Sequence, residues 1–223
     1  MVKEKLEVVV MNKKLLNKLL KWPKPFIFGK DLIFLLDRSA HSRYSIIKRC
    51  IQENYLKRIR RDLFVLTEKC QKELPDSFEL AHVIYGPSYI SFESALSFHN
   101  WIPEAVYTIT SATSKRNKNF ETFLGMFSYE HVPLPDYHFG VHQYDVDNCV
   151  HFIADPWKAI ADYIYSRHKT WPSLETLCED MRIEKESIIS SDKGILKQLS
   201  LSYHNKRVRD CLNIFLKDIG NEY

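Results

Sequence analysis

Apolar residues recur at helical spacing in three successive stretches near the beginning of the chain. Residues 13–22 carry leucines on one stripe, and residues 29–37 form a shorter apolar segment. The third stretch, 39–54, begins next to Asp37 and Ser39, and either side chain can accept a hydrogen bond from a free backbone N–H of the first turn. The pattern therefore predicts three helices in succession.

The third predicted helix has two different faces when its residues are placed at intervals of about 100°. An apolar sector would dock the helix on a core, and it holds Ala40, Tyr44, Ile47 and Ile51, with Cys50 at its flank. The opposite side is polar and basic, and it holds Arg38, His41, Ser42, Ser45, Lys48, Arg49 and Gln52. This side suits a helix that enters the DNA major groove, because Ser, His, Arg and Lys reach base edges and phosphates.

A basic β-hairpin is predicted directly after this helix. Tyr55–Ile59 and Leu63–Thr67 have the composition of two short strands, and Asp62 tolerates the tight turn between them. Helices followed by a two-stranded hairpin are the order of a winged helix-turn-helix, in which the hairpin, or wing, lies along the phosphate backbone. Each phosphate that a cation neutralises releases counterions and adds salt-sensitive affinity.

The residues expected to contact double-stranded DNA follow from this arrangement. We expect the major groove to be read by His41, Ser42, Ser45, Lys48 and Arg49. We expect phosphates to be contacted by Lys57, Arg58, Arg60 and Arg61. A solvated basic surface is the ordinary alternative for any one of these features.

The rest of the chain mixes both periodicities and predicts an α+β domain in which a sheet is followed by C-terminal helices. Helical patterns cover 78–85, 91–101, 154–168, 173–181, 192–201 and 208–215, and strand patterns cover 105–110, 119–132, 138–146 and 149–154. A polar, turn-prone stretch around Pro75 separates the two parts. We therefore divide the chain into a DNA-binding domain, 1–72, and an α+β domain, 73–223.

The net charge of +4 is divided unevenly between these parts. Residues 1–70 carry 17 Lys and Arg against 7 Asp and Glu, whereas residues 71–223 carry 15 against 21. Such asymmetry predicts that the first part meets a polyanion. Nucleic acid is the commonest such partner, and an anionic membrane surface is the second. The basic helix, the basic hairpin and the charge of the segment together favour nucleic acid.

Cysteine usage and hydropathy indicate the compartment. The five cysteines are widely spaced and never form a CxxC pair, which argues against a disulfide framework or a zinc ribbon. The apolar run near the N-terminus is too short for a signal-peptide core. The longest uncharged stretch is well below the ~20 residues that span a bilayer. We expect a soluble cytoplasmic protein with no membrane partner.

A dense group of possible metal ligands raises the alternative of an enzyme. The group consists of His131, His138, His142, Asp145, Asp147, Cys149 and His151. Its spacing matches no zinc pattern, and His142 and Asp147 would point to opposite faces of an unbroken strand. The chain also has no Gly-rich phosphate loop and no nucleophile elbow. We expect no catalytic, cofactor-binding or metal-binding residues, with a metal-dependent nuclease targeted by the winged helix as the alternative.

Several motifs occur in an order that is characteristic of one family. They are "SYISFESALSFHNWIPEAVYTITSAT" at 88–113, then "FETFLGMFSYEHV", "YHFG" and "DPWKAIADYIY", preceded by "YLKRIRRDLFVL" at the predicted wing. In this order the chain resembles the AbiEi-type antitoxin family of type IV (abortive-infection) toxin–antitoxin systems over about residues 12–218.

The resemblance implies a bacterial phage-defence protein of two domains. An N-terminal winged helix would repress its own operon by binding upstream inverted repeats. A C-terminal antitoxin domain would counter a nucleotidyltransferase-like toxin, generally without a stable complex between the two proteins. A regulator that has lost its toxin is a further possibility. Two positions depart from the family pattern: Asp62 stands where the wing usually has Gly, and Trp157 stands where an acidic residue is common.

Overall fold

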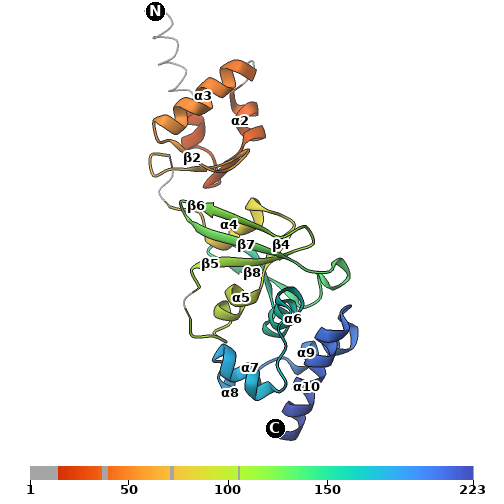
Figure 1. The fold of residues 1–223 in the computed structure, drawn as a ribbon. Helices are drawn as coiled ribbons and strands as arrows, with labels where there is room; N and C mark the ends of the chain where they lie inside the picture. The colour runs from red at the N-terminus through yellow and green to blue at the C-terminus, as the bar shows by residue number, and fades with distance from the viewer. Residues whose placement is uncertain (1–14, 37–39, 71–72, 105, 223) are drawn as a thin grey trace, which may run out of the picture. The chain divides into compact units, whose positions relative to one another are not determined.

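The computed structural model of the chain describes residues 15–36, 40–70, 73–104 and 106–222. Within these ranges the protein mixes helices with two β-sheets, which confirms the expected α+β class. The chain forms two compact units, Met1–Asp76 and Ser77–Tyr223, which Figure 1 colours from red to blue along the sequence. The sequence pattern places the joint four residues earlier, at residue 72.

The first unit combines short helices with a three-stranded antiparallel sheet. Residues 15–20 are helical. The elements that follow are β1 (Phe26–Phe28), α2 (Gly29–Leu36), α3 (Ala40–Gln52), β2 (Leu56–Arg60) and β3 (Leu63–Leu66). The strand order is β1-β3-β2, so β3 is the central strand. The predicted helices and hairpin are confirmed, whereas β1 was not expected, because three apolar residues between Pro25 and Gly29 are too few to show a period of two.

The β2–β3 hairpin is closed by a two-residue turn of Arg61 and Asp62. Asp62 has a φ of 60°, the left-handed conformation that Asp and Asn tolerate better than most residues. The backbone N–H of Gly29 donates to the carbonyl of Asp62 at 2.9 Å, which extends the pairing of β1 with β3 to the turn. A Cβ on Gly29, the first residue of α2, would lie 3.1 Å from Oδ1 of Asp62, so a larger residue there would require the exposed Asp62 side chain to shift.

The core of the first unit forms where the helices cover one face of the sheet. Its buried residues are Leu15, Leu19, Ile27, Leu32, Ile46, Cys50, Leu56, Phe64, Leu66 and Cys70. Helix α3 therefore docks through Ile46 and Cys50, with Ile47 at the edge of the core. The expectation that Tyr44 faces the core is wrong, since 66% of this side chain is exposed. The helix is turned so that the i, i+4 pair Ile46 and Cys50 lies at the centre of the contact.

The second unit is built on a six-stranded mixed sheet in the order β6-β7-β5-β4-β9-β8. The strands are β4 (Ser88–Ile90), β5 (Thr108–Thr113), β6 (Lys118–Thr122), β7 (Gly125–His131), β8 (Val141–Val146) and β9 (Cys149–Ala154). Pairs β5–β7 and β4–β9 are parallel and the others antiparallel. The strands expected from alternation are present, although β5 begins three residues later than predicted, and β4 was too short to be recognised.

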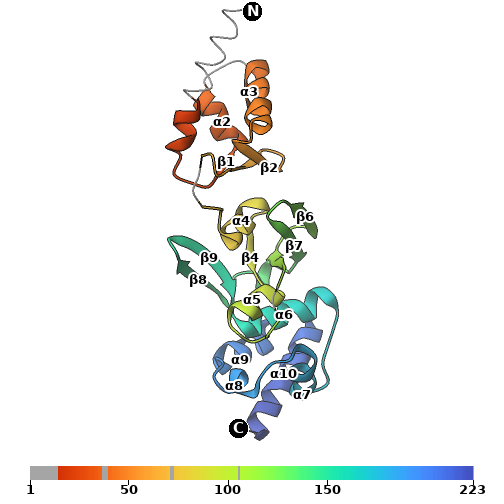
Figure 2. The same cartoon turned by 90° about the vertical axis from the view of Figure 1, so that its left-hand side faces the viewer.

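Helices cover both faces of this sheet. They are α4 (Ser77–Ile84), α5 (Phe92–Phe98), α6 (Pro156–Arg167), α7 (Leu174–Met181), α8 (Lys185–Ile189), α9 (Lys193–Ser202) and α10 (Lys206–Glu222), with a short 3-10 helix η1 (Leu134–Asp136). Helix α4 lies on one face, and α5 and α6 lie on the other (Figures 1 and 2). Helices α9 and α10 pack against the outer side of α6.

The ends and faces of these helices follow the sequence signals. The side chain of Asp155 accepts a hydrogen bond from the Trp157 N–H, and Pro156 occupies the first helical position of α6, as predicted. The predicted stripe of α10 is buried, and it consists of Val208, Cys211, Leu212 and Phe215. In the part of the chain that the structure describes, no helix combines the length and apolarity that crossing a bilayer requires.

Candidate functional site

The side chains that the structure describes on helix α3 cover only part of the expected basic surface. Ser45 and Lys48 are exposed, and Arg49 is half-buried. Tyr44 joins Ser45 and Lys48 on the exposed face, which sequence reasoning missed. Its phenolic hydroxyl was the available signal, because a tyrosine presents both an apolar body and a polar tip. His41 and Ser42 belong to α3, but their side chains lie outside the described part of the structure.

The β2–β3 hairpin presents a second group of cations. Lys57 and Arg58 are both exposed although they are adjacent. They pair regularly with Val65 and Phe64, so they point to opposite faces of the edge strand β2, and a register shift follows between Arg58 and Arg60. The guanidinium of Arg58 lies 5.4 Å from the centre of the Phe64 ring, which supports it from the sheet side. Arg61, at the turn, has 95% of its side chain exposed.

Arg60 differs from the other hairpin cations. It is half-buried, its Nη1 donates to the carbonyl of Arg61 at 3.0 Å, and its Nε is buried without a hydrogen-bond partner among the described residues. Part of this guanidinium is therefore engaged in the turn itself. Of the two cations next to Asp62, only Arg61 projects fully into solvent.

The possible metal ligands of residues 131–151 are separated in the fold. His151 is buried against the ring of Phe78, whereas His142 and Asp145 are exposed on β8. The Sγ of Cys149 lies 3.6 Å from a carboxylate oxygen of Glu79. No cluster of three or more His, Cys, Asp or Glu suited to a metal ion occurs in the ranges that the structure describes.

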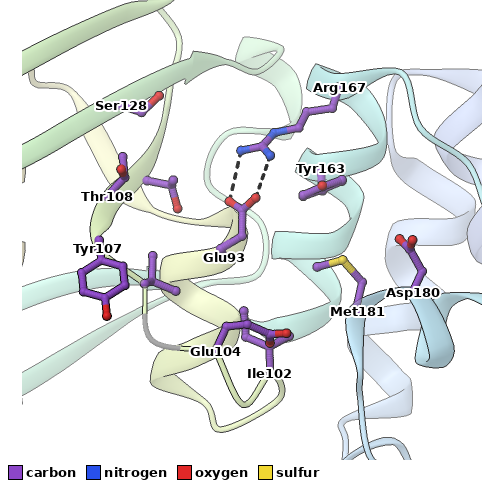
Figure 3. A pocket seen from close by; sticks show the side chains of 12 residues that line it. Glu93, Ile102, Glu104, Tyr107, Thr108, Ser128, Tyr163, Arg167, Asp180 and Met181 are labelled. Atoms are coloured by element: carbon purple, nitrogen blue, oxygen red, sulfur yellow. Dashed lines mark hydrogen bonds and ion pairs between the residues drawn. The ribbon is translucent and has the colours of Figure 1, made fainter.

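The second unit contains a pocket of about 550 Å³ that the sequence did not indicate. It opens on the α5–α6 side of the sheet and is lined by Glu93, Ile102, Glu104, Val106, Tyr107, Thr108, Thr110, Ser128, Tyr163, Arg167, Asp180 and Met181. In Figure 3, Thr108 and Ser128 from the strands line one side, Tyr163 and Met181 line the other, and Glu93 lies between them. These residues come from segments far apart in the chain, which is why no local pattern predicted the pocket.

Arg167, the last residue of α6, is held by two carboxylates at this pocket. Its Nη1 and Nη2 donate to the two oxygens of Glu93 at 2.6 and 3.1 Å, and its Nε and Nη2 donate to Glu130 at 3.2 and 3.0 Å. Burial opposes the charge, but Glu93 and Glu130 raise the pKa of Arg167 above its usual value. The guanidinium also lies 4.6 Å from the Tyr163 ring centre.

A separate buried polar cluster surrounds Asp162 of α6. One carboxylate oxygen accepts from Lys158 at 2.5 Å and from the hydroxyl of Tyr203 at 3.2 Å, and the other accepts from Tyr89 and Ser91 at 2.8 and 2.9 Å. The Lys158 and Asp162 side chains are fully buried. Burial, followed by the charge of Asp162, raises the pKa of both tyrosines, so they stay neutral donors. These hydrogen bonds connect α6 to β4 and to Tyr203, the C-cap residue of α9. The cluster therefore has a structural role.

Trp157, at a position where the family that the chain resembles commonly has an acidic residue, is a core residue. It is fully buried, and its ring packs edge-on against Trp101, with 5.0 Å between centres, and near Phe215. An acidic side chain at this position would be buried among aromatic rings, so the indole fits this fold and a carboxylate does not.

No protein-family model and no curated protein matches this chain.

Proposed function

We propose that the first unit is a winged helix-turn-helix that binds double-stranded DNA. The element order supports this assignment: a helix at 15–20, then β1, α2, α3 and the β2–β3 hairpin, with β1 completing the sheet. The observation that carries the proposal is the exposure of Lys48 on α3 and of three cations on the hairpin that follows it, within a segment of strongly positive charge. A recognition helix and a wing need these two surfaces.

The contacts divide between base reading and phosphate binding. Ser45 and Lys48 of α3 are the described residues best placed to reach base edges. Tyr44 is added to the residues expected to read the major groove. His41, Ser42 and Arg49 are kept in this group from the sequence prediction. Lys57, Arg58 and Arg61 are assigned to phosphates. Arg60 is assigned mainly to the turn, because its guanidinium already donates to the backbone there. Phosphate contacts supply affinity, and base contacts supply preference for a sequence.

We propose that the whole chain is a cytoplasmic, non-enzymatic antitoxin that also represses its own operon. The order of the motifs quoted above supports this step, which goes beyond the geometry of either unit. The second unit would counter a nucleotidyltransferase-like toxin without forming a stable complex with it, and the DNA-binding unit would recognise inverted repeats in the operator.

A reporter gene under the chain's own upstream region tests the repressor role. We expect the wild-type chain to lower expression, and we expect the Lys48→Ala and Arg61→Ala variants to relieve this repression. Gln198→Ala, at an exposed position of α9 in the second unit, is the control and should repress fully. Equal repression by all four proteins would contradict the assignment of α3 and the hairpin.

Growth on co-expression with the product of the adjacent gene tests the antitoxin role. We expect that gene to encode a nucleotidyltransferase whose toxicity the chain relieves.

Incubation of the purified chain with supercoiled plasmid and Mg²⁺ or Mn²⁺ tests the nuclease alternative. Metal-dependent cleavage by wild-type protein would contradict the non-enzymatic proposal.

A further inference from the structure

The pocket of the second unit combines an apolar floor with acidic walls. Ile102 is buried and Met181 half-buried beneath it, and three carboxylates line it, those of Glu93, Glu104 and Asp180. Its volume of about 550 Å³ lies within the range of ordinary ligand pockets. The lining therefore suits a group that is apolar along its length and positively charged at its end.

Among the described residues that line the pocket, Arg167 is the one cation, and it is not available to a ligand. Arg167 uses its guanidinium on Glu93 and Glu130, so this group of three charges carries a net charge of −1. An anionic ligand would meet Glu93 and Glu130 beside the arginine and would have to displace them. These two carboxylates make the pocket unsuitable for a phosphate or a carboxylate.

Glu104 and Asp180 are in a different situation from Glu93. Each has an ion pair, with Arg182 and Lys169 respectively, but all four side chains are more than one third exposed. Ion pairs this exposed contribute little, so an incoming cation can replace them at small cost. The hydrogen bonds from Lys169 and from the Trp171 indole hold the pKa of Asp180 below its usual range, so its charge persists in mildly acidic solution.

The rim of the pocket has the composition of a protein-binding surface. Tyr107 is 90% exposed at the opening, and Met126, whose partner in the β5–β7 ladder is Thr108 of the pocket wall, is 40% exposed. Tyrosine and methionine are enriched at the centres of protein interfaces. They provide contact area around the opening for residues that flank an inserted side chain.

We propose that this pocket is a docking site for a basic segment of a partner protein. An arginine or lysine side chain of that segment lies along Ile102 and Met181 and places its charge between Glu104 and Asp180, while its neighbours in the segment contact Tyr107. The proposal is independent of DNA binding, since all of these residues belong to the second unit.

Selection from a phage-displayed library of random nonapeptides on the immobilised full chain tests the proposal. We expect enriched peptides to contain Arg or Lys next to apolar residues. Fluorescence anisotropy with the best peptide then compares variants. Glu104→Gln and Tyr107→Ala should each weaken binding by about five-fold or more, the scale of interface residues that matter. Replacing the peptide's arginine with neutral citrulline, or its lysine with norleucine, should abolish binding, because the peptide then loses its positive charge.

Asp145→Asn is the matched control. It removes the same charge from an exposed side chain on β8, at the opposite edge of the sheet from β6, and should leave peptide binding unchanged. Three results would overturn the proposal: no enrichment of basic peptides, equal weakening by Asp145→Asn and Glu104→Gln, or unchanged binding by both pocket variants. Circular dichroism of each variant establishes that a loss of binding does not arise from unfolding.

Discussion

Asp62 contributes to the hairpin in two ways, through its backbone conformation and through the charge of its carboxylate. Its left-handed backbone closes the two-residue turn, and its carboxylate is 3.7 Å from the guanidinium of Arg61. The carboxylate is mostly exposed, so this ion pair adds little to folding. In the proposed wing, however, it places a negative charge beside the cation that contacts phosphates.

Asp62→Asn should therefore increase affinity for DNA. Asparagine tolerates the same left-handed backbone, so the turn is kept while the charge repelling phosphate is lost. We expect a dissociation constant about two- to three-fold lower at low salt, from the Coulomb energy of one screened charge. Fluorescence anisotropy measures it. Glu68→Gln, an exposed charge outside the turn, is the control, and an equal gain there would show an effect of net charge alone.

Asp155 should make stability depend on pH. It caps α6, and burial raises its pKa to about 6, above the value of about 3.9 for an unfolded chain. Between these values the folded state binds more protons, so the contribution of Asp155 to stability falls as pH rises from about 4 to about 6. Asp155→Asn keeps a capping oxygen and should remove this part of the dependence.

Urea unfolding at several pH values between 4 and 7 measures the effect. Relative to the variant, the wild-type chain should become less stable as pH rises through this window. Glu175→Gln, at an exposed position in the first turn of α7, is the control for loss of one carboxylate near a helix N-terminus. Parallel pH profiles for wild type and Asp155→Asn would contradict the account.

At the scale of elements, the two hairpin arginines should differ in their effect on DNA binding. Arg61→Ala should lower the slope of log affinity against log salt concentration by about 1, because one phosphate contact is lost. Arg60→Ala should lower it by clearly less, because its guanidinium is partly committed to the turn. Binding measured over a range of salt concentrations distinguishes them. A slope change of about 1 from each substitution would show that Arg60 also contacts phosphate.

The buried ion pair of Lys158 and Asp162 in helix α6 should contribute to the free energy of unfolding. Lys158→Met leaves the Asp162 carboxylate buried without its cation, which costs about 3–5 kcal/mol in comparable buried pairs. Urea unfolding gives the difference. Lys206→Met removes the cation of an exposed pair with the same i, i+4 spacing and should cost less than about 1 kcal/mol. Similar losses from the two variants would contradict the structural role of the Asp162 cluster.

The same helix shows how far the sequence predicts the structure. Its cap and apolar stripe are local signals, and both were correct. Lys158 and Asp162 have the spacing of an ordinary surface pair, and their burial depends on Tyr89 and Tyr203, which are distant in the sequence. For the same reason the pocket around Glu93 and Arg167 could not be predicted.

In the first unit the hairpin was predictable from the sequence, whereas the orientation of helix α3 was not. The basic hairpin was predicted with its turn, because the strand composition and Asp62 are signals within one short stretch of the sequence. The exposure of Tyr44 was not, because a shift of the buried stripe to Ile46 and Cys50 is decided by the packing of the whole core. The register shift between Arg58 and Arg60 likewise depends on the partner strand.

At the scale of the whole molecule, the two units differ in charge and in the chemistry of their surfaces. The basic part of the sequence coincides with the unit that carries α3 and the hairpin, whereas the acidic part contains the pocket of Glu104 and Asp180. This division agrees with the two proposals, in which the first unit recognises DNA and the second recognises a basic protein segment.

The proposed function requires that the chain binds its own upstream DNA specifically. This is tested by the binding of the full chain to a fluorescent duplex from that region and to a scrambled duplex of the same composition, at salt concentrations from about 50 to 200 mM. We expect a clear preference for the upstream duplex and a steep loss of affinity with salt. Equal affinity for the two duplexes would contradict it, and the basic surface would then serve another polyanion.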